Sequence, residues 1–189
     1  SILSELLFVA AVTVNDGEAQ RSNVESISLR FNQATNLEAL IASGQISDAV
    51  QVAGIVLDNS RFRYDPSSYV LVIDLTVDGF GGSRATMLAD GRYHVQLDTS
   101  LIRAEALAVI SLLDDDGLAD GFRRVAFHRL EGDFDGDRMV GTKDRDAFFT
   151  HYGSIDGQKR YDFAFDLNGD GVINIVDYFA LIALWGHTL

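Results

Sequence analysis

The sequence lacks cysteine, has a single proline among 189 residues, and carries 15 basic residues against 28 acidic ones. Without cysteine, disulfide scaffolds, thiolate zinc sites and cysteine nucleophiles are excluded. The formal net charge of −13 argues against a nucleic-acid or anionic-membrane partner, because either would meet a negative surface. No run approaches the roughly 20 apolar residues that a membrane-spanning helix needs. We therefore expect no nucleic-acid partner and no membrane insertion.

Residues 1–130 alternate short runs of β-branched and aromatic residues with turn signals such as Asp-Gly and Gly-Gly. This pattern predicts an antiparallel sandwich, and 47% apolar residues are enough for its core. The end of the apolar stretch 1–14 favours one strand, and short helical or irregular connections are expected at 36–43 and 101–107. Five further runs predict strands: 24–31, 50–57, 69–77, 92–97 and 122–130.

An internal repeat begins after residue 130. The segment 133–144 aligns with 166–177 at an offset of 33, and the alignment continues without gaps through the stretches that follow. These stretches, 144–152 and 178–185, are expected to be helices. A duplicated loop-plus-helix unit explains the repeat better than chance does.

Each of the two loops places oxygen-bearing side chains at positions 1, 3, 5 and 12, and position 7 offers a backbone carbonyl. Calcium takes six to eight oxygen ligands at about 2.3–2.6 Å, whereas magnesium keeps more water and uses fewer protein ligands. The sequence therefore predicts two Ca²⁺ sites, against the alternative of two acidic surface turns. The predicted ligands are Asp133, Asp135, Asp137, Met139 and Asp144 in the first loop and Asp166, Asn168, Asp170, Val172 and Asp177 in the second.

Two further loop positions predict local structure. Position 6 takes a sharp turn that glycine eases; Gly171 meets this need and Arg138 does not, which costs on the order of 1–3 kcal/mol. Position 8 is apolar in both loops, and we expect Val140 and Ile173 to pair as a short strand contact between the loops.

The segment from about 131 to 189 resembles a type I dockerin module, a family with two duplicated loop–helix calcium units and Asp at position 12. The resemblance implies EF-hand-like loops in a small α-helical domain, an extracellular or cell-surface location, and docking onto a cohesin-like domain of a scaffold or cell-surface protein. Members are often attached to polysaccharide-degrading enzymes. The resemblance also implies partner contacts at loop positions 10 and 11, here Thr142, Lys143, Ile175 and Val176.

The run Leu-Ala-Asp-Gly-Arg-Tyr-His-Val-Gln-Leu at 88–97 resembles a strand entry of bacterial Ig-like domains. The whole chain is similar to C-terminal tails of large secreted proteins from planctomycete-type bacteria. We therefore predict a two-domain fold, with an all-β Ig-like sandwich at 1–130 followed by a small α-helical dockerin-like domain at 131–189. The chain does not begin with Met, and we expect it to be part of a larger protein.

The second predicted helix, 178–185, is apolar all the way round, whereas the first is amphipathic. A helix that covers one surface needs only an apolar stripe. We therefore expect the second helix to pack on the first with one face and on the sandwich or a partner with another. Packing within the chain is favoured, because exposed apolar patches are rare.

The predicted function is that of a non-catalytic, calcium-binding protein–protein interaction module. No G-x-S-x-G elbow, phosphate loop or H-E-x-x-H motif occurs. One alternative is a calcium-stabilised structural tail without a cohesin partner. Another is a carbohydrate-binding or polysaccharide-degrading fragment, for which Arg61 and Arg63, interleaved with Phe62 and Tyr64, are candidate sugar contacts. The acidic stretch 114–121 favours a solvated turn over a third cation site, and the four histidines show no paired metal spacing.

Overall fold

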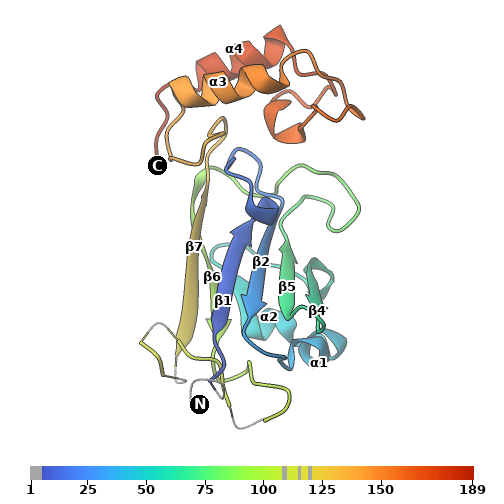
Figure 1. Cartoon of the computed structure of the whole chain (residues 1–189), viewed down its shortest axis with the longest axis vertical. Coiled ribbons are helices and arrows are strands. Elements are labelled where there is room, and N and C mark those ends of the chain that lie inside the picture. The colour runs from blue at the N-terminus through green and yellow to red at the C-terminus, as the bar shows by residue number, and fades with distance from the viewer. Residues whose placement is uncertain (1–5, 108–109, 115, 119–120) are drawn as a thin grey trace.

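Two antiparallel sheets form the body of the protein in this computed structural model, which describes residues 6–107, 110–114, 116–118 and 121–189 (Figure 1). The strand order is β1-β2-β5-β4 in the four-stranded sheet and β3-β6-β7 in the three-stranded sheet. The strands are β1 (Val9–Val14), β2 (Ser26–Phe31), β3 (Val50–Val52), β4 (Phe62–Asp65), β5 (Val70–Asp74), β6 (Gly91–Asp98) and β7 (Phe122–Arg129).

The alternation of apolar and polar residues along the strands creates the core between the sheets. In β2, Ile27 and Leu29 are buried and face Ile73 and Leu71 of β5 in register. Successive side chains of a strand point to opposite faces, so one face of the sheet becomes continuously apolar. Residues of both sheets, including Leu97 of β6, belong to this cluster, which we call the sheet core.

Four short α-helices complete the described elements: α1 (Leu37–Ala42), α2 (Ile46–Ala49), α3 (Thr142–His151) and α4 (Ile175–Ala183). Three 3₁₀ turns occur at Asn15–Gly17 (η2), Asn59–Arg61 (η3) and Phe163–Phe165 (η4). Figure 1 shows α3 and α4 beyond one end of the sheets, with α1 and α2 toward the other. None of the helices in the described part of the chain is long and apolar enough to cross a membrane.

The predicted fold class, an Ig-like sandwich followed by a separate α-helical dockerin-like domain, is wrong. The described chain is mostly β-sheet, and its four α-helices are short. The segment after residue 130 contains only α3, of 10 residues, and α4, of 9, joined by loops and turns. The molecule therefore has no clear split into a β domain and a helical one.

Hydrogen bonds across the predicted boundary at 130/131 give the physical reason. The Arg21 amide donates to the Asp133 carbonyl at 2.7 Å, and the Leu130 amide donates to the Arg21 carbonyl at 3.0 Å. The Gly132 amide donates to Ser22 Oγ at 3.0 Å. Strand β7 contributes Phe127 to the sheet core, while Leu130 just after it belongs to the next cluster. The boundary is thus held by the segment around residue 21 and is no free linker.

Most predicted elements occur, with shifted ends. The predicted strand 50–57 is shortened to β3, and the segment 36–43 contains α1. No helix forms at 101–107. Both C-terminal helices begin earlier than predicted, at Thr142 and Ile175. The backbone amide of the residue just before each helix donates to an aspartate carboxylate in the first helical turn, and this hydrogen bond stabilises the earlier start.

Candidate metal centre

The first loop, residues 133–144 (loop 1), is organised around two buried carboxylates. Asp144 Oδ1 accepts the Phe134 amide at 2.7 Å, and its Oδ2 accepts the Gly141 amide at 2.7 Å. Asp133 accepts the amides of Gly136 and Arg138 at 2.7 and 3.1 Å. Burial raises the pKa of the Asp144 carboxyl, and the nearby Asp135 charge adds to this, although the backbone hydrogen bonds oppose it. A cation at this point would relieve the crowding of negative charge.

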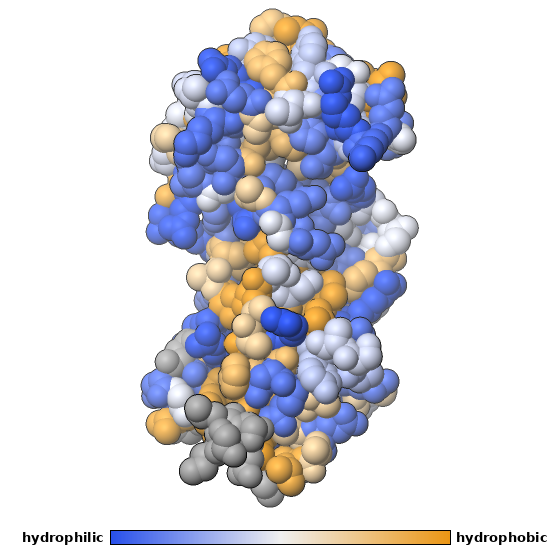
Figure 2. Space-filling view, viewed as in Figure 1, coloured by the Kyte–Doolittle hydropathy of each residue, from blue (hydrophilic) through white to orange (hydrophobic). Residues whose placement is uncertain are grey.

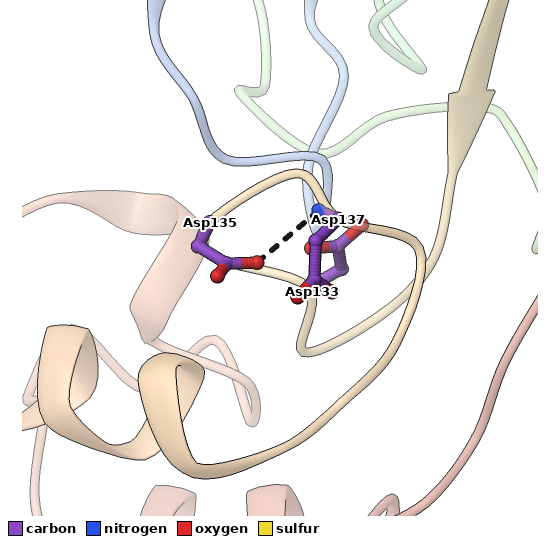
Figure 3. Close-up of side chains that lie close together, drawn as sticks. All are labelled: Asp133, Asp135 and Asp137. Carbon is purple, nitrogen blue, oxygen red and sulfur yellow. Dashed lines mark hydrogen bonds between the residues drawn. The ribbon is translucent and has the colours of Figure 1, made fainter.

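Three carboxylates converge in loop 1, as Figure 3 shows for Asp133, Asp135 and Asp137. One oxygen from each lies within 4.8 Å of the others. Two ligands of an ion at about 2.4 Å can be at most about 4.8 Å apart, so these oxygens are close enough together to share one calcium ion. Asp144 at position 12 is buried, and both of its oxygens accept backbone amides of the loop; it is not one of the three carboxylates that converge. The donor set is all oxygen, which suits calcium and not a softer metal.

The second loop, residues 166–177 (loop 2), repeats most of the hydrogen bonds of loop 1 at the offset of 33. Its Asn168 amide corresponds to the Asp135 amide, which donates to Asp144 Oδ1 at 3.1 Å. Asp177 accepts the amides of Asn168 and Asn174 at 3.1 and 2.8 Å. Asp166 accepts the amides of Gly169 and Gly171 at 2.9 and 2.7 Å. The two loops therefore share one backbone conformation, and the predicted ligand positions correspond in space as well as in sequence.

His128 and Tyr161 support the position-1 carboxylates, and the sequence analysis missed both. His128 Nε2 lies 2.8 Å from Asp133 Oδ2 in a buried pair. Tyr161 Oη donates to Asp166 Oδ2 at 2.7 Å, and burial together with this hydrogen bond raises the pKa of Tyr161. Both residues lie five positions before their loop and 33 apart. Extending the repeat upstream would have found them. Such supporting groups fix the orientation of a ligand.

Lys143 distinguishes loop 1 from loop 2. Its ammonium Nζ lies 3.2 Å from Asp135 Oδ2 and 3.5 Å from Asp137 Oδ2. The hydrogen bond to Asp135 and the two carboxylate charges raise the pKa of Lys143. The corresponding residue of loop 2 is Val176, which has no charge.

Position 6 is left-handed in both loops. Arg138 has φ +73° and Gly171 has φ +87°, so the predicted strain at Arg138 is present in the backbone. A residue with a Cβ is disfavoured in this region, whereas glycine is not.

Arg138→Gly is therefore expected to raise the free energy of unfolding by about 1 kcal/mol. The matched change in loop 2, Gly171→Arg, should lower it by about 1–2 kcal/mol. Urea unfolding of both variants in the presence of chelator measures these shifts. Equal stability of Arg138→Gly and the unmodified chain would contradict the strain.

The predicted strand contact between Val140 and Ile173 is wrong, because each pairs elsewhere. The Val140 amide donates to the His187 carbonyl at 2.9 Å, just after α4. The Ile173 amide donates to the Ser154 carbonyl at 3.0 Å, just after α3. Loop 1 is therefore hydrogen-bonded to the segment after α4, and loop 2 to the segment after α3, so each repeat unit contacts the other.

A second hydrophobic cluster, which we call the loop core, lies beneath the loops and helices. Phe134 of loop 1 stacks on Phe165 with ring centroids 4.2 Å apart, and Phe148 of α3 is completely buried. Both position-8 residues belong to the cluster, so the loops cannot shift without disturbing it. Its buried members are Leu130, Phe134, Val140, Phe148, Ala164, Phe165, Ile173 and Leu181.

Helix α4 packs on α3 and on the segment after β7, but one of its faces is exposed in the described structure. Leu181 is buried, and a Cβ on Gly132 would lie 3.1 Å from its Cδ1 atom. Phe179 is 64% exposed. Figure 2 shows apolar residues among hydrophilic ones on this end of the molecule. The exposed apolar residues of the α4 face, as we call it, are Ile175, Val176, Phe179, Ile182 and Trp185.

The predicted partner residues at positions 10 and 11 are all exposed, at the starts of α3 and α4. Thr142 and Lys143 are polar, whereas Ile175 and Val176 begin the α4 face. The structure therefore brings the second pair, but not the first, into an apolar surface.

The candidate sugar contacts around Arg61 are occupied. Arg61 donates to the carbonyls of Thr76 and Val77, and the Arg63 guanidinium lies 3.8 Å from the ring centroid of Phe80. Phe62 is buried and offers no stacking face. Residues 115, 119 and 120 of the predicted acidic turn lie outside the described residues.

No known protein family and no curated protein matches the chain. The solved structures that match it include the N-terminal and C-terminal interface mutants of a type II cohesin–X–dockerin complex from Acetivibrio cellulolyticus. Identities are 18% and 17%, each alignment covers 74% of this chain and 81% of the other, and both TM-scores are 0.28. These TM-scores are too low to transfer a fold or a function.

Proposed function

We propose that this chain is a non-catalytic, calcium-binding protein–protein interaction module. The observation that carries the proposal is the duplicated loop, in which the same backbone-to-carboxylate hydrogen bonds recur 33 residues apart. Independent surface turns would not share so many contacts at corresponding positions. A repeat that preserves the ligand positions and their supports is what a pair of metal sites requires.

In this proposal each loop holds one Ca²⁺ through its position 1, 3, 5 and 12 side chains and its position 7 carbonyl. The ion supplies the positive charge that the crowded carboxylates need. Of the 11 acidic residues in 131–189, seven are proposed ligands. Calcium binding would thus stabilise the fold, because an ion that binds only the folded loops shifts the folding equilibrium toward them.

The α4 face is the proposed binding surface for a protein partner. Its apolar residues are spaced along one side of the helix, and exposed apolar patches of this kind mark interaction sites. At the corresponding positions α3 has Thr142, Lys143 and Asp146, so the two helices differ in surface toward their starts. Phe149 of α3 and Tyr152 just after it are exposed, as their counterparts on and after α4 are. We infer that the partner binds in one orientation, through α4.

A cohesin-type domain is the partner that the motif resemblance suggests, and an extracellular or cell-surface location goes with it. We propose no catalytic reaction for the chain, because the carboxylates that recur in the repeat are proposed as calcium ligands. The structural-tail alternative retains calcium and predicts no partner.

Phe179→Asp is expected to weaken binding to a cohesin-type domain by more than tenfold, because it places a charge at the centre of the α4 face. Surface plasmon resonance against a panel of such domains, with calcium present, measures the effect. Phe122→Asp is the matched control, since Phe122 is also exposed but lies on β7. If no domain of the panel binds the unmodified chain, the structural-tail alternative is favoured.

Calorimetric titration with calcium tests the metal half of the proposal separately. We expect two ions per chain, and little heat with magnesium at the same concentration. Absence of calcium heat in a folded sample would contradict the assignment.

A further inference from the structure

The two loops differ most at position 11, where Lys143 of loop 1 corresponds to Val176 of loop 2. The Lys143 ammonium contacts the carboxylates at positions 3 and 5 of its own loop, at 3.2 and 3.5 Å. Asp135 and Asp137 are both proposed calcium ligands, so the ammonium occupies part of the proposed site. In loop 2 the corresponding contact is neutral, because Asn168 Nδ2 donates to Asp170 Oδ2 at 2.9 Å.

We propose that the loops fill in sequence, loop 2 before loop 1, because Lys143 competes with calcium as a cation tethered to loop 1. This inference rests on the calcium-binding function proposed above. To bind calcium, loop 1 must release the ammonium from Asp135 and Asp137. In loop 2, calcium binding requires only that the Asn168 side-chain amide rotate away from Asp170. The Lys143 side chain is 75% exposed, so it can move into solvent when an ion takes its place.

Counting charges explains why the extra carboxylate of loop 1 gives it no advantage. Loop 1 has four ligand carboxylates, and loop 2 has three because Asn168 replaces an aspartate. The Lys143 ammonium cancels one of the four. Arg138 adds a second positive charge to loop 1, so the net charge is −2 on loop 1 and −3 on loop 2, and the extra carboxylate does not favour loop 1.

Exchange of the position-11 residues tests the inference. Lys143→Val should tighten the weaker step of a calorimetric calcium titration by about fivefold and leave the tighter step unchanged. Val176→Lys should weaken the tighter step by a similar factor. Both side chains are exposed, so the variants are expected to fold. Lys159→Val is the matched control, because it removes the same charge from an exposed site outside both loops.

Terbium luminescence identifies the loop that fills first. Tyr161 is hydrogen-bonded to Asp166, so it can sensitise terbium(III) held in loop 2, and His128 has the corresponding place beside loop 1. The Tyr161-sensitised signal, defined by its loss in Tyr161→Phe, should saturate with the first equivalent of terbium.

The outcomes separate this inference from the proposed function. Two calcium steps of equal affinity that Lys143→Val leaves unchanged would overturn the filling order while leaving calcium binding intact. A Lys143→Val effect no larger than that of Lys159→Val would also overturn it. Absence of any calcium binding by the unmodified chain would overturn both proposals.

Discussion

Asp177→Ala is expected to reduce calcium affinity at loop 2 by more than about 100-fold and to destabilise the chain even without calcium. Loss of an outer-shell partner costs about 10–100-fold in metal affinity, and Asp177 is a proposed direct ligand at position 12. Its carboxylate also accepts the backbone amides of Asn168 and Asn174, and the second of these hydrogen bonds caps the N-terminus of α4.

The metal-free effect follows from the burial of this carboxylate. Asp177 is completely buried, and alanine would leave two backbone amides without their acceptor. A lost helix cap costs about 0.5–2 kcal/mol, and a buried unsatisfied donor about 1–3 kcal/mol. We therefore expect a loss of about 2–4 kcal/mol in the free energy of unfolding.

Urea unfolding with chelator and calorimetric titration with calcium measure the two effects of Asp177→Ala. Asp146→Ala is the control, because Asp146 lies on α3 with a side chain 63% exposed and is not a proposed ligand. If Asp177→Ala matched Asp146→Ala in both measurements, the role of position 12 would be refuted.

Phe148→Ala should lower the free energy of unfolding by about 3–5 kcal/mol, the usual cost of emptying a buried phenylalanine site. Phe148 of α3 is completely buried in the loop core and packs against Phe134 and Tyr178, with ring centroids 6.5 and 5.9 Å away. The cavity would lie between loop 1 and α4, so the position of both loops depends on this side chain.

Phe149→Ala provides a control of the same residue type on the same helix. Phe149 is 49% exposed, and its removal should cost about 1 kcal/mol or less. Denaturant unfolding of both variants measures the two losses in the free energy of unfolding. Similar losses for Phe148→Ala and Phe149→Ala would show that the loop core does not hold the loops.

The local features of the candidate site could be predicted from the sequence because they repeat. The offset of 33 carries the ligand positions from loop 1 to loop 2, and most of the hydrogen bonds of loop 1 recur in loop 2. The same offset extended to His128 and Tyr161 would have revealed their supporting role. The left-handed turn at Arg138 also followed from the loop pattern.

The long-range arrangement could not be predicted in this way. The hydrogen bonds of Arg21 with Leu130 and Asp133 join segments about 110 residues apart, and no local pattern marks them. The predicted two-domain split failed for this reason. The crosswise pairing of Val140 and Ile173 was missed because apolar residues at position 8 indicate a buried strand contact without specifying its partner.

Scanning calorimetry of the whole chain, with calcium and with a chelator, tests the central claim most directly. Binding of calcium to the folded loops stabilises the chain by about 2.7 kcal/mol per site at 100 times the dissociation constant. We therefore predict a melting temperature that is several degrees higher with calcium than with chelator, and not restored by magnesium. A melting profile unchanged by chelator would contradict the account.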